Sequence, residues 1–282
     1  MRSVVAQGKV PLIGNRAAGA YRVLTYAAPA IAGPARPGQF VSAAVGGPTS
    51  AHLLRRSFSI HRAVEGIVEL VVSPVGPGSE WLCGLQPGDE VDLVGPLGRP
   101  FPLPRDAVSC VLVGGGYGSA PLFWLAEALR ARGCHVEMVL GAATEASLFR
   151  VDDARRVANG TTVTTDDGSA GSRGWVSDVL GTVISLSRAS VVYACGPMGM
   201  LQSVATIAAR HDAIAQVAVE EAMACGVGVC MTCVLPVVGD DGQTRMTRSC
   251  VEGPVFRGDR IRWEAFADGR CLVPADAVGA PR

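Results

Sequence analysis

The N-terminal part of the chain contains short apolar runs of strand length, separated by Gly and Pro. These runs occupy residues 20–29, 38–45, 55–63, 66–76 and 88–98. They are rich in β-branched residues, and their apolar positions do not recur with a helical period. A single helical turn fits residues 79–85. Closely spaced strands of this kind predict an antiparallel β-barrel or sandwich.

A different pattern begins after the Gly- and Pro-rich residues 95–106, which mark a domain edge. A continuous apolar run is followed by apolar residues at helical spacing, and this alternation repeats along the chain. The predicted strands are residues 108–116, 135–143, 161–168 and 190–196. The predicted helices are residues 120–133, 146–150, 175–187 and 198–211. Alternating strands and helices predict a doubly wound parallel sheet with helices on both faces.

The C-terminal part is rich in Cys, Gly and turn residues. Residues 234–256 predict a hairpin that turns at Asp240-Asp241-Gly242. The tail after Trp263 carries no motif that indicates a function. The chain therefore divides into three predicted domains, at residues 1–101, 102–214 and 215–282. The predicted fold class is multidomain α+β.

Composition and charge narrow the classes of partner. The chain carries 25 Lys and Arg against 25 Asp and Glu, without a long basic run. This balance gives no electrostatic reason to expect nucleic acid or an anionic membrane as partner. No apolar run approaches the roughly 18 residues of a membrane span, and the first residues do not resemble a secretory signal. We therefore expect a cytoplasmic protein that binds a small molecule or another protein.

Cysteine is the most informative residue type in this sequence. An odd number of cysteines, nine, without a secretory signal argues against a disulfide framework and favours metal or redox chemistry. Four of them follow the spacing C-x4-C-x2-C-x16-C: Cys225, Cys230, Cys233 and Cys250. This spacing is typical of plant-type [2Fe–2S] proteins, in which four thiolates surround two irons. Gly226 and Gly228 would let the loop curl and direct backbone N–H groups at the sulfurs.

Two other interpretations of the cluster are a zinc site and a chance grouping of buried cysteines. Zinc sites usually combine two C-x2–4-C pairs, whereas this chain has one pair and two single cysteines, so the iron–sulfur interpretation is favoured. The remaining cysteines have no mutual spacing. We expect small buried packing roles for Cys83, Cys110, Cys134 and Cys271.

A glycine-rich turn lies between the first predicted strand and helix of the α/β region. It reads Gly116-x-Gly118-x-x-Pro121, which would bring backbone N–H groups and a helix N-terminus to a pyrophosphate. The alternative is a tight turn without a ligand. Ligands of such sheets bind beyond the carboxyl ends of the strands. The other segments at strand ends are Gly141-Ala142, Asp166-Asp167-Gly168 and Cys195-Gly196-Pro197-Met198, in which the two aspartates are either ligand-binding or turn residues.

Several motifs together resemble a known family. They are Arg56-x-x-Ser59, residues 76–82, 95–98, 114–122 and 195–201, and the cysteine cluster. In this order they resemble the ferredoxin–NADP reductase superfamily and, more closely, the electron-transfer subunits of class 1B dihydroorotate dehydrogenase. The resemblance spans about residues 5–260. It implies an FAD-binding antiparallel β-barrel, an NAD-binding parallel α/β domain and a small C-terminal [2Fe–2S] domain.

The resemblance also implies a role for individual residues. FAD would be bound by Arg56, Ser57, Phe58, Ser59, Val71, Val72, Ser73, Gly78 and Ser79. The nicotinamide nucleotide would be bound by Gly116, Gly118, Pro121, Cys195, Gly196 and Pro197, although Cys195 could equally be a packing residue. The metal ligands would be Cys225, Cys230, Cys233 and Cys250. Ser57 and Ser79 replace a proline and a threonine that the family usually has.

The implied activity is electron transfer without a side-chain acid or base. Electrons would pass from an FMN-containing catalytic subunit that oxidises dihydroorotate, through [2Fe–2S] and FAD, to NAD⁺ in pyrimidine biosynthesis. The implied assembly is a heterotetramer of two catalytic and two electron-transfer subunits. Residues 141–149 lack an arginine for a 2′-phosphate, which favours NAD over NADP, although Arg150 lies nearby. The alternatives are a subunit of a hydrogenase or bifurcating transhydrogenase, and a non-enzymatic redox sensor.

Overall fold

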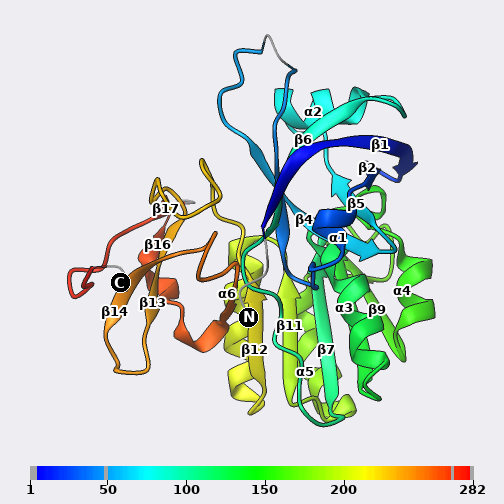
Figure 1. The fold of residues 1–282 in the computed structure, drawn as a ribbon. Helices are drawn as coiled ribbons and strands as arrows, with labels where there is room; N and C mark the ends of the chain where they lie inside the picture. The colour runs from blue at the N-terminus through cyan, green and yellow to red at the C-terminus, as the bar shows by residue number, and fades with distance from the viewer. Residues whose placement is uncertain (1–4, 48–49, 268–269, 280–282) are drawn as a thin grey trace.

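A computed structural model describes residues 5–47, 50–267 and 270–279 of the chain (Figure 1). Six antiparallel strands near the N-terminus close into a barrel, in the order β1-β2-β5-β4-β3-β6. They are β1 (Ala6–Ala18), β2 (Tyr21–Ala27), β3 (Phe40–Ala43), β4 (Arg56–Val64), β5 (Ile67–Val72) and β6 (Glu90–Leu97). The predicted alternatives of barrel and sandwich are thus resolved in favour of the barrel.

The barrel core is formed by the inward-facing side chains of alternating strand positions. Leu24, Tyr26, Leu70 and Leu93 are fully buried there. Two short helices flank the barrel, α1 (Pro29–Ala32) and α2 (Pro77–Gly84). The second of these covers the predicted helical turn at residues 79–85 except for Leu85, which follows the helix.

Strand β1 was missing from the sequence prediction, which begins the first strand at residue 20. Only Leu12 of its 13 residues is buried, so the strand lacks an apolar alternation that periodicity could detect. It forms because its backbone pairs with β2 on one side and β6 on the other. Tertiary pairing, rather than side-chain pattern, defines this strand.

The second sheet has seven strands in the order β10-β9-β8-β7-β11-β12-β15. The strands are β7 (Ser109–Gly115), β8 (His135–Ala142), β9 (Gly160–Thr165), β10 (Ser172–Arg173), β11 (Val191–Cys195), β12 (Ile214–Ala218) and β15 (Val255–Arg257). All neighbours from β10 to β12 are parallel, and only β15 is antiparallel. The order steps outward in both directions from β7, as in a doubly wound sheet.

Helices cover both faces of this sheet, as predicted (Figure 1). They are α3 (Ala120–Arg130), α4 (Val151–Val157), α5 (Val176–Ser187) and α6 (Met198–Arg210). Leu122 and Leu125 of α3 belong to one apolar cluster, and Leu180 of α5 and Leu201 of α6 belong to the other. The predicted helix at residues 146–150 was misplaced. Glu145–Ser147 form a 3-10 turn, and the α-helix begins at Val151.

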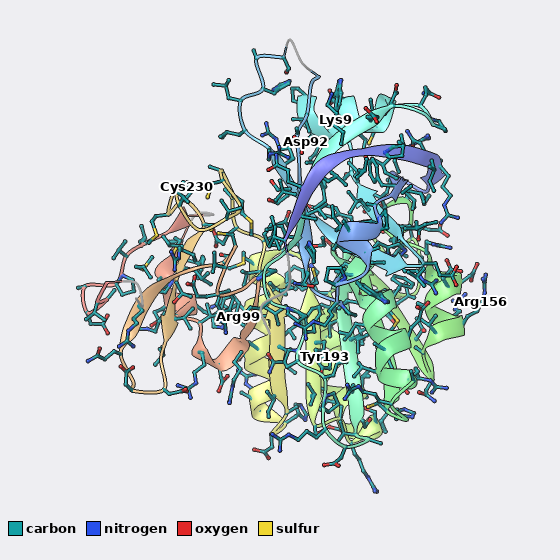
Figure 2. The ribbon with its side chains drawn as sticks, viewed as in Figure 1. Lys9, Asp92, Arg99, Arg156, Tyr193 and Cys230 are labelled. Atoms are coloured by element: carbon teal, nitrogen blue, oxygen red, sulfur yellow. The ribbon has the colours of Figure 1, made fainter. Side chains whose placement is uncertain are left out.

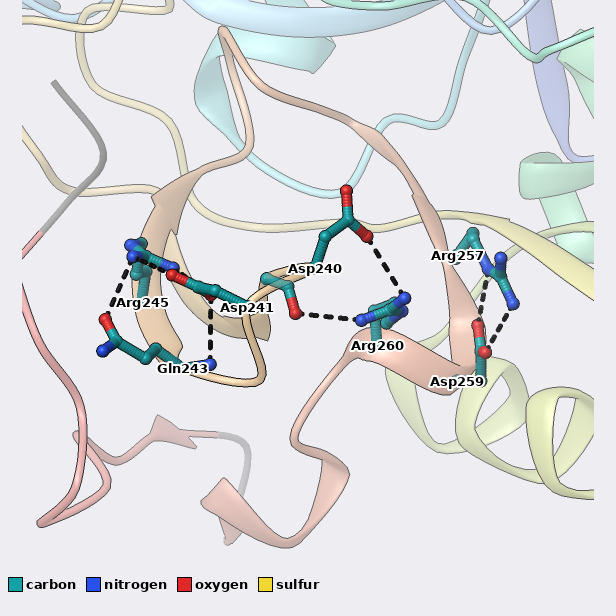
Figure 3. Close-up of polar contacts among 8 residues, drawn as sticks. Asp240, Asp241, Gln243, Arg245, Arg257, Asp259 and Arg260 are labelled. Atoms are coloured by element: carbon teal, nitrogen blue, oxygen red, sulfur yellow. Dashed lines mark hydrogen bonds and ion pairs between the residues drawn. The ribbon is translucent and has the colours of Figure 1, made fainter.

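The C-terminal part is built on the predicted hairpin. Strands β13 (Val234–Val238) and β14 (Thr244–Arg248) pair around a turn that Gly242 forms at φ +76°. Ion pairs of Asp241 with Arg245 and of Asp240 with Arg260 surround this turn (Figure 3). Beyond it lie two 3-10 turns (Gly258–Arg260 and Trp263–Ala265) and the short pair β16 (Phe266–Ala267) and β17 (Arg270–Cys271).

Two features bear on the predicted domain division. Strand β12 (Ile214–Ala218) spans the predicted boundary at residue 214, and β15 returns from the C-terminal part to join the larger sheet. The division at residues 101 and 214 therefore stays a prediction. Among the described residues, no helix is both long and apolar enough to cross a membrane.

Candidate functional site

Two of the four clustered cysteines are buried against the barrel. Cys233 and Cys250 are each 2% exposed and pack with Phe40 and Leu97, which lie on the barrel strands β3 and β6. Ser249 joins their two segments, because its backbone N–H and its hydroxyl both donate to the Cys233 carbonyl, at 2.9 and 2.6 Å. Of the other two, Cys225 is half-buried, and Cys230 is exposed (Figure 2).

The loop between the first two cysteines is wound around the sulfur of Cys225. Backbone N–H groups of Val227, Val229 and Cys230 point at Cys225 Sγ, at 3.4, 3.3 and 3.5 Å. This winding requires the left-handed backbone of Gly226 (φ +70°) and Gly228 (φ +87°). The expected use of these glycines, to curl the loop and direct N–H groups at a sulfur, is confirmed.

The surroundings of two of these cysteines, Cys230 and Cys233, favour the thiolate, which is the metal-binding form of cysteine. Hydrogen bonds from Thr232 lower the pKa of Cys230 to about 6. A hydrogen bond from Cys250 lowers the pKa of Cys233 to about 6, and the same hydrogen bond raises the pKa of Cys250. The backbone N–H of Gly228 acts on Cys250 in the opposite direction.

This donor set fits a [2Fe–2S] core. Four soft sulfur donors match iron in such clusters, and N–H groups directed at sulfur are the usual outer contacts of those ligands. Within the described ranges, no three Cys, His, Asp or Glu residues are grouped to hold a metal ion directly. A two-iron core spreads its ligands over a larger volume than one zinc ion does. The ligand roles of the individual cysteines stay predictions.

Two of the predicted flavin residues, Arg56 and Gly78, lie close together. Arg56 begins β4, and Gly78 lies in the first turn of α2. A Cβ on Gly78 would be 3.3 Å from Arg56 Nε and 3.1 Å from Val45 Cγ2, so the guanidinium packs directly against this turn. Among the described residues no carboxylate pairs with Arg56, whose Nη1 donates to the Leu54 carbonyl at 2.9 Å. A guanidinium that pairs with no described carboxylate and lies beside a helix N-terminus suits a pyrophosphate.

Other predicted flavin residues have different environments. Ser79 caps α2: its hydroxyl accepts from the backbone N–H groups of Val75 and Gly76, at 3.1 and 3.2 Å, and donates to the Gly76 carbonyl. Val72 is fully buried in the barrel core, whereas Val71 faces the cluster shared with the larger sheet. Contact of Val72 with a flavin would therefore use its backbone. Ser57, Phe58 and Ser73 are half-buried, and Ser59 is exposed.

A cavity of about 570 Å³ opens at the carboxyl ends of the parallel strands. Of the predicted nucleotide residues, Gly116 and Pro197 line it, whereas four buried residues do not: Gly118, Pro121, Cys195 and Gly196. Gly118 serves close packing: a Cβ there would be 2.7 Å from Gly196 Cα and 2.9 Å from the Cys195 carbonyl oxygen. The two glycine turns on the cavity wall thus touch backbone to backbone.

The role of Cys195 is narrowed by its burial. Cys195 is only 9% exposed, and burial raises the pKa of its thiol to about 12. A neutral thiol that does not line the cavity favours the packing role over direct contact with the nucleotide, and both roles stay predictions.

The two aspartates after β9 have different surroundings. Asp167 closes the local turn, since its Oδ1 accepts from the backbone N–H and the hydroxyl of Ser169, at 3.0 and 2.6 Å. Asp166 is exposed and lines the cavity. Trp175, which is 66% exposed, also lines the cavity. Of the two aspartates, only Asp166 is placed to contact a ligand in the cavity.

The sequence analysis did not identify three further residues that line the cavity: Tyr21, Tyr117 and Glu220. The Tyr117 hydroxyl donates to Glu220 Oε1 at 2.6 Å, and burial raises the pKa of Tyr117. Tyr21 comes from the barrel, and its hydroxyl donates to the Ser147 carbonyl at 2.7 Å. The barrel therefore forms part of the cavity wall. The one signal available for Glu220 was an acidic residue two positions after the end of strand β12.

This arrangement defines a class of protein. A six-stranded barrel followed by a doubly wound NAD-binding sheet is the architecture of the ferredoxin–NADP reductase superfamily, and the cysteine-rich C-terminal part adds an iron–sulfur centre. Residues 112–206 match the oxidoreductase NAD-binding domain. Residues 220–262 match the iron–sulfur cluster binding domain of dihydroorotate dehydrogenase B.

Whole-chain similarities give the particular family. The chain is 37% identical to the electron transfer subunit of dihydroorotate dehydrogenase B (NAD(+)) from Desulforamulus reducens, over 86% of this chain and 92% of that one. It is 40% identical to the Geobacillus kaustophilus subunit of the same name, over 80% and 86%. The chain belongs to this family of electron transfer subunits. Its cofactors are FAD, a [2Fe–2S] cluster and NAD.

A solved structure of NADH-dependent reduced ferredoxin–NADP oxidoreductase, described in the context of flavin-based electron bifurcation, is also similar. It is 30% identical to this chain, with a TM-score of 0.79 and 90% coverage of each chain. The same fold thus occurs in another electron-transfer setting.

Proposed function

We propose that this chain is the cytoplasmic electron-transfer subunit of an NAD-dependent dihydroorotate dehydrogenase in pyrimidine biosynthesis. In this role it takes electrons from an FMN-containing subunit that oxidises dihydroorotate, in a heterotetramer of two plus two subunits. One observation carries the proposal: the barrel contacts both other sites. Phe40 and Leu97 pack on the buried cysteines, and Tyr21 lines the nucleotide cavity.

The side chains of this subunit bind and orient cofactors. When bound, FAD exchanges a hydride with nicotinamide and single electrons with the iron–sulfur centre. Arg56 and the first turn of α2 hold the flavin pyrophosphate, and the Gly116 turn holds that of NAD. The four cysteines hold the cluster. No side-chain acid or base is needed for these steps.

The partner would dock where the cluster comes closest to the surface. Exposed apolar side chains surround the exposed Cys230: Val227, Val229, Met231 and Val251. Grouped exposed apolar residues are typical of protein interfaces. A surface of this kind over the cluster would exclude water between the two subunits and shorten the path for electrons.

Replacing Val229 with glutamate should weaken the complex with the catalytic subunit at least about tenfold, since a buried unpaired charge costs more than about 1.4 kcal/mol. Val229 is 80% exposed, so the isolated subunit should fold normally. Leu186→Glu is the matched control, because Leu186 is 81% exposed but lies on α5, in the parallel-sheet domain. Titration of the catalytic subunit by calorimetry measures both affinities. Equal affinities for the two variants would contradict this docking surface.

The test of the whole proposal is reconstitution with an FMN-containing dihydroorotate-oxidising subunit. Dihydroorotate-dependent reduction of NAD⁺ should require both proteins. The second candidate, a subunit of an NADH-dependent ferredoxin–NADP oxidoreductase, is favoured by the 30% identity and the TM-score of 0.79. Pull-down from the native source separates the two, because the partner is an FMN protein in the first case and a larger NADPH-binding iron–sulfur protein in the second. Absence of NADH-dependent dye reduction in flavin-loaded protein would instead favour a redox sensor.

Asp166→Asn should reduce the preference for NADH over NADPH. A carboxylate beside the ribose accepts hydrogen bonds from its hydroxyls and repels a 2′-phosphate, whereas the amide keeps the shape and removes the charge. A change of about tenfold in the ratio of the two kcat/KM values corresponds to about 1.4 kcal/mol. Asp152→Asn on α4 is the control, since Asp152 is exposed and does not line the cavity. An unchanged ratio for Asp166→Asn would place the ribose elsewhere.

A further inference from the structure

Arg248, at the end of β14, reaches two segments that carry cluster cysteines. Its Nη1 donates to the Gly228 carbonyl at 3.0 Å, inside the loop between Cys225 and Cys230. Its Nη2 and Nε donate to the carboxylate of Glu252, at 2.6 and 3.2 Å. The planar guanidinium supplies these three N–H groups in fixed directions, which a lysine could not do.

Glu252 closes the turn that contains Cys250. Its Oε2 accepts from the backbone N–H of Arg248 at 3.1 Å, and its own backbone N–H donates to the Arg248 carbonyl at 2.9 Å. Arg248 and Glu252, the first and last residues of segment 248–252, are thus hydrogen-bonded to each other through both backbone and side-chain groups. Cys250 has little freedom to move within it.

The loop also lies directly on this turn. A Cβ on Gly228 would be 2.5 Å from Val251 Cγ2, so only glycine permits the observed approach. Because Arg248 holds the Gly228 carbonyl from the other segment, it links the loop of the first three cysteines to the turn of the fourth. Ligands that are separated in sequence are held in one geometry by this contact.

The charges of this pair are close to the sulfurs and partly shielded from water. The side chains of Arg248 and Glu252 are 25% and 18% exposed. Arg248 is two residues from Cys250 in the chain, and its bond to the Gly228 carbonyl places the guanidinium beside the loop between Cys225 and Cys230. Charges at partly buried positions are weakly screened by salt.

We propose that Arg248 is a positioning residue that clamps the cluster loop onto the Cys250 turn, and that Arg248 and Glu252 together set the reduction potential of the cluster. The proposal rests on the proposed [2Fe–2S] site. Reduction adds a negative charge, so a nearby cation favours the reduced state and a nearby anion disfavours it.

Substitutions of Arg248 and of Glu252 should therefore shift the reduction potential of the cluster in opposite directions. Arg248→Gln removes the cation and leaves Glu252 unpaired, so the midpoint potential should become more negative. Glu252→Gln removes the anion and should make the potential more positive. A purely structural role would not produce shifts of opposite sign. Arg248→Lys keeps the charge but loses the fork, and should retain less iron with a potential near that of the unchanged protein.

The experiment is a redox titration of the flavin- and cluster-loaded full chain, followed by electron paramagnetic resonance, with iron content measured in parallel. Arg245→Gln is the control on the same strand, because Arg245 pairs with Asp241 at the far end of the hairpin (Figure 3). Its potential should not change.

Opposite shifts support the proposal, and so does loss of iron with retained flavin in either variant. Unshifted or equally shifted potentials in variants with a full cluster would overturn it. Absence of a cluster from the unchanged protein would instead overturn the proposed iron–sulfur site itself.

Discussion

Replacing Cys250 with serine should remove the iron–sulfur cluster and leave the flavin bound. Cys250 is buried between the other cysteine segment and the barrel residues Phe40 and Leu97, where a neutral hydroxyl cannot replace a thiolate ligand. The predicted flavin contacts of Arg56 and Gly78 do not involve this region. Dihydroorotate-dependent NAD⁺ reduction in the reconstituted complex should fall to background, because the path between the subunits is broken. NADH-dependent reduction of an artificial dye should persist.

Two measurements check this expectation. Absorbance reports flavin and cluster separately, and electron paramagnetic resonance after reduction reports the cluster alone. Cys83→Ser is the matched control, since Cys83 is half-buried in α2 and far from the cysteine cluster in sequence and fold. The control should keep both chromophores. A full cluster in the Cys250 variant would contradict its assignment as a ligand.

The parts of the fold that sequence predicted well are those with strong periodicity. The apolar run before Gly116 and the helical spacing of Leu122, Leu125 and Leu129 give an unmistakable strand and helix, because one is buried on both faces and the other on one side. The hairpin of β13 and β14 was found from its turn residues. In each case a local pattern and the final packing agree.

The elements that sequence missed are defined by distant partners. Strand β1 is mostly exposed and exists through pairing with β2 and β6. Strand β15 is only Val255–Arg257, and it is recognisable as a strand through its pairing with β12. No single-sequence pattern could assign either of them, because the decisive hydrogen bonds join residues far apart in the chain.

The candidate site divides in the same way. The spacing of the four cysteines indicated an iron–sulfur cluster, because the ligands of plant-type [2Fe–2S] centres follow a characteristic spacing in the sequence. The cavity wall was predicted only in part, since Tyr21 and Glu220 reach it from the barrel and from beyond β12. Gly118 was expected to contact a pyrophosphate, but its lack of a side chain is required by the close approach of the Cys195-Gly196 turn. Both roles require a glycine, so the sequence alone does not distinguish them.

Gly118→Ala should both destabilise the protein and weaken nucleotide binding. The new Cβ would lie 2.7 Å from Gly196 Cα and 2.9 Å from the Cys195 carbonyl oxygen, and backbone atoms cannot turn aside as a flexible side chain could. The two turns must therefore separate. Gly116 of one turn and Pro197 of the other line the cavity, so separation displaces groups that would face the dinucleotide. Overpacking of this kind costs about 1–3 kcal/mol in unfolding free energy.

The expected result is an NADH KM at least about tenfold higher in the dye-reduction assay, which corresponds to about 1.4 kcal/mol of lost binding. Denaturant unfolding measures the stability change in the same preparation. Gly84→Ala provides the control, since Gly84 ends α2 and has nothing within 4 Å of its would-be Cβ. It should leave the KM unchanged and, as a helical glycine, not lower stability. If Gly118→Ala behaved like this control, the close contact between the two turns would not be what shapes the nucleotide cavity.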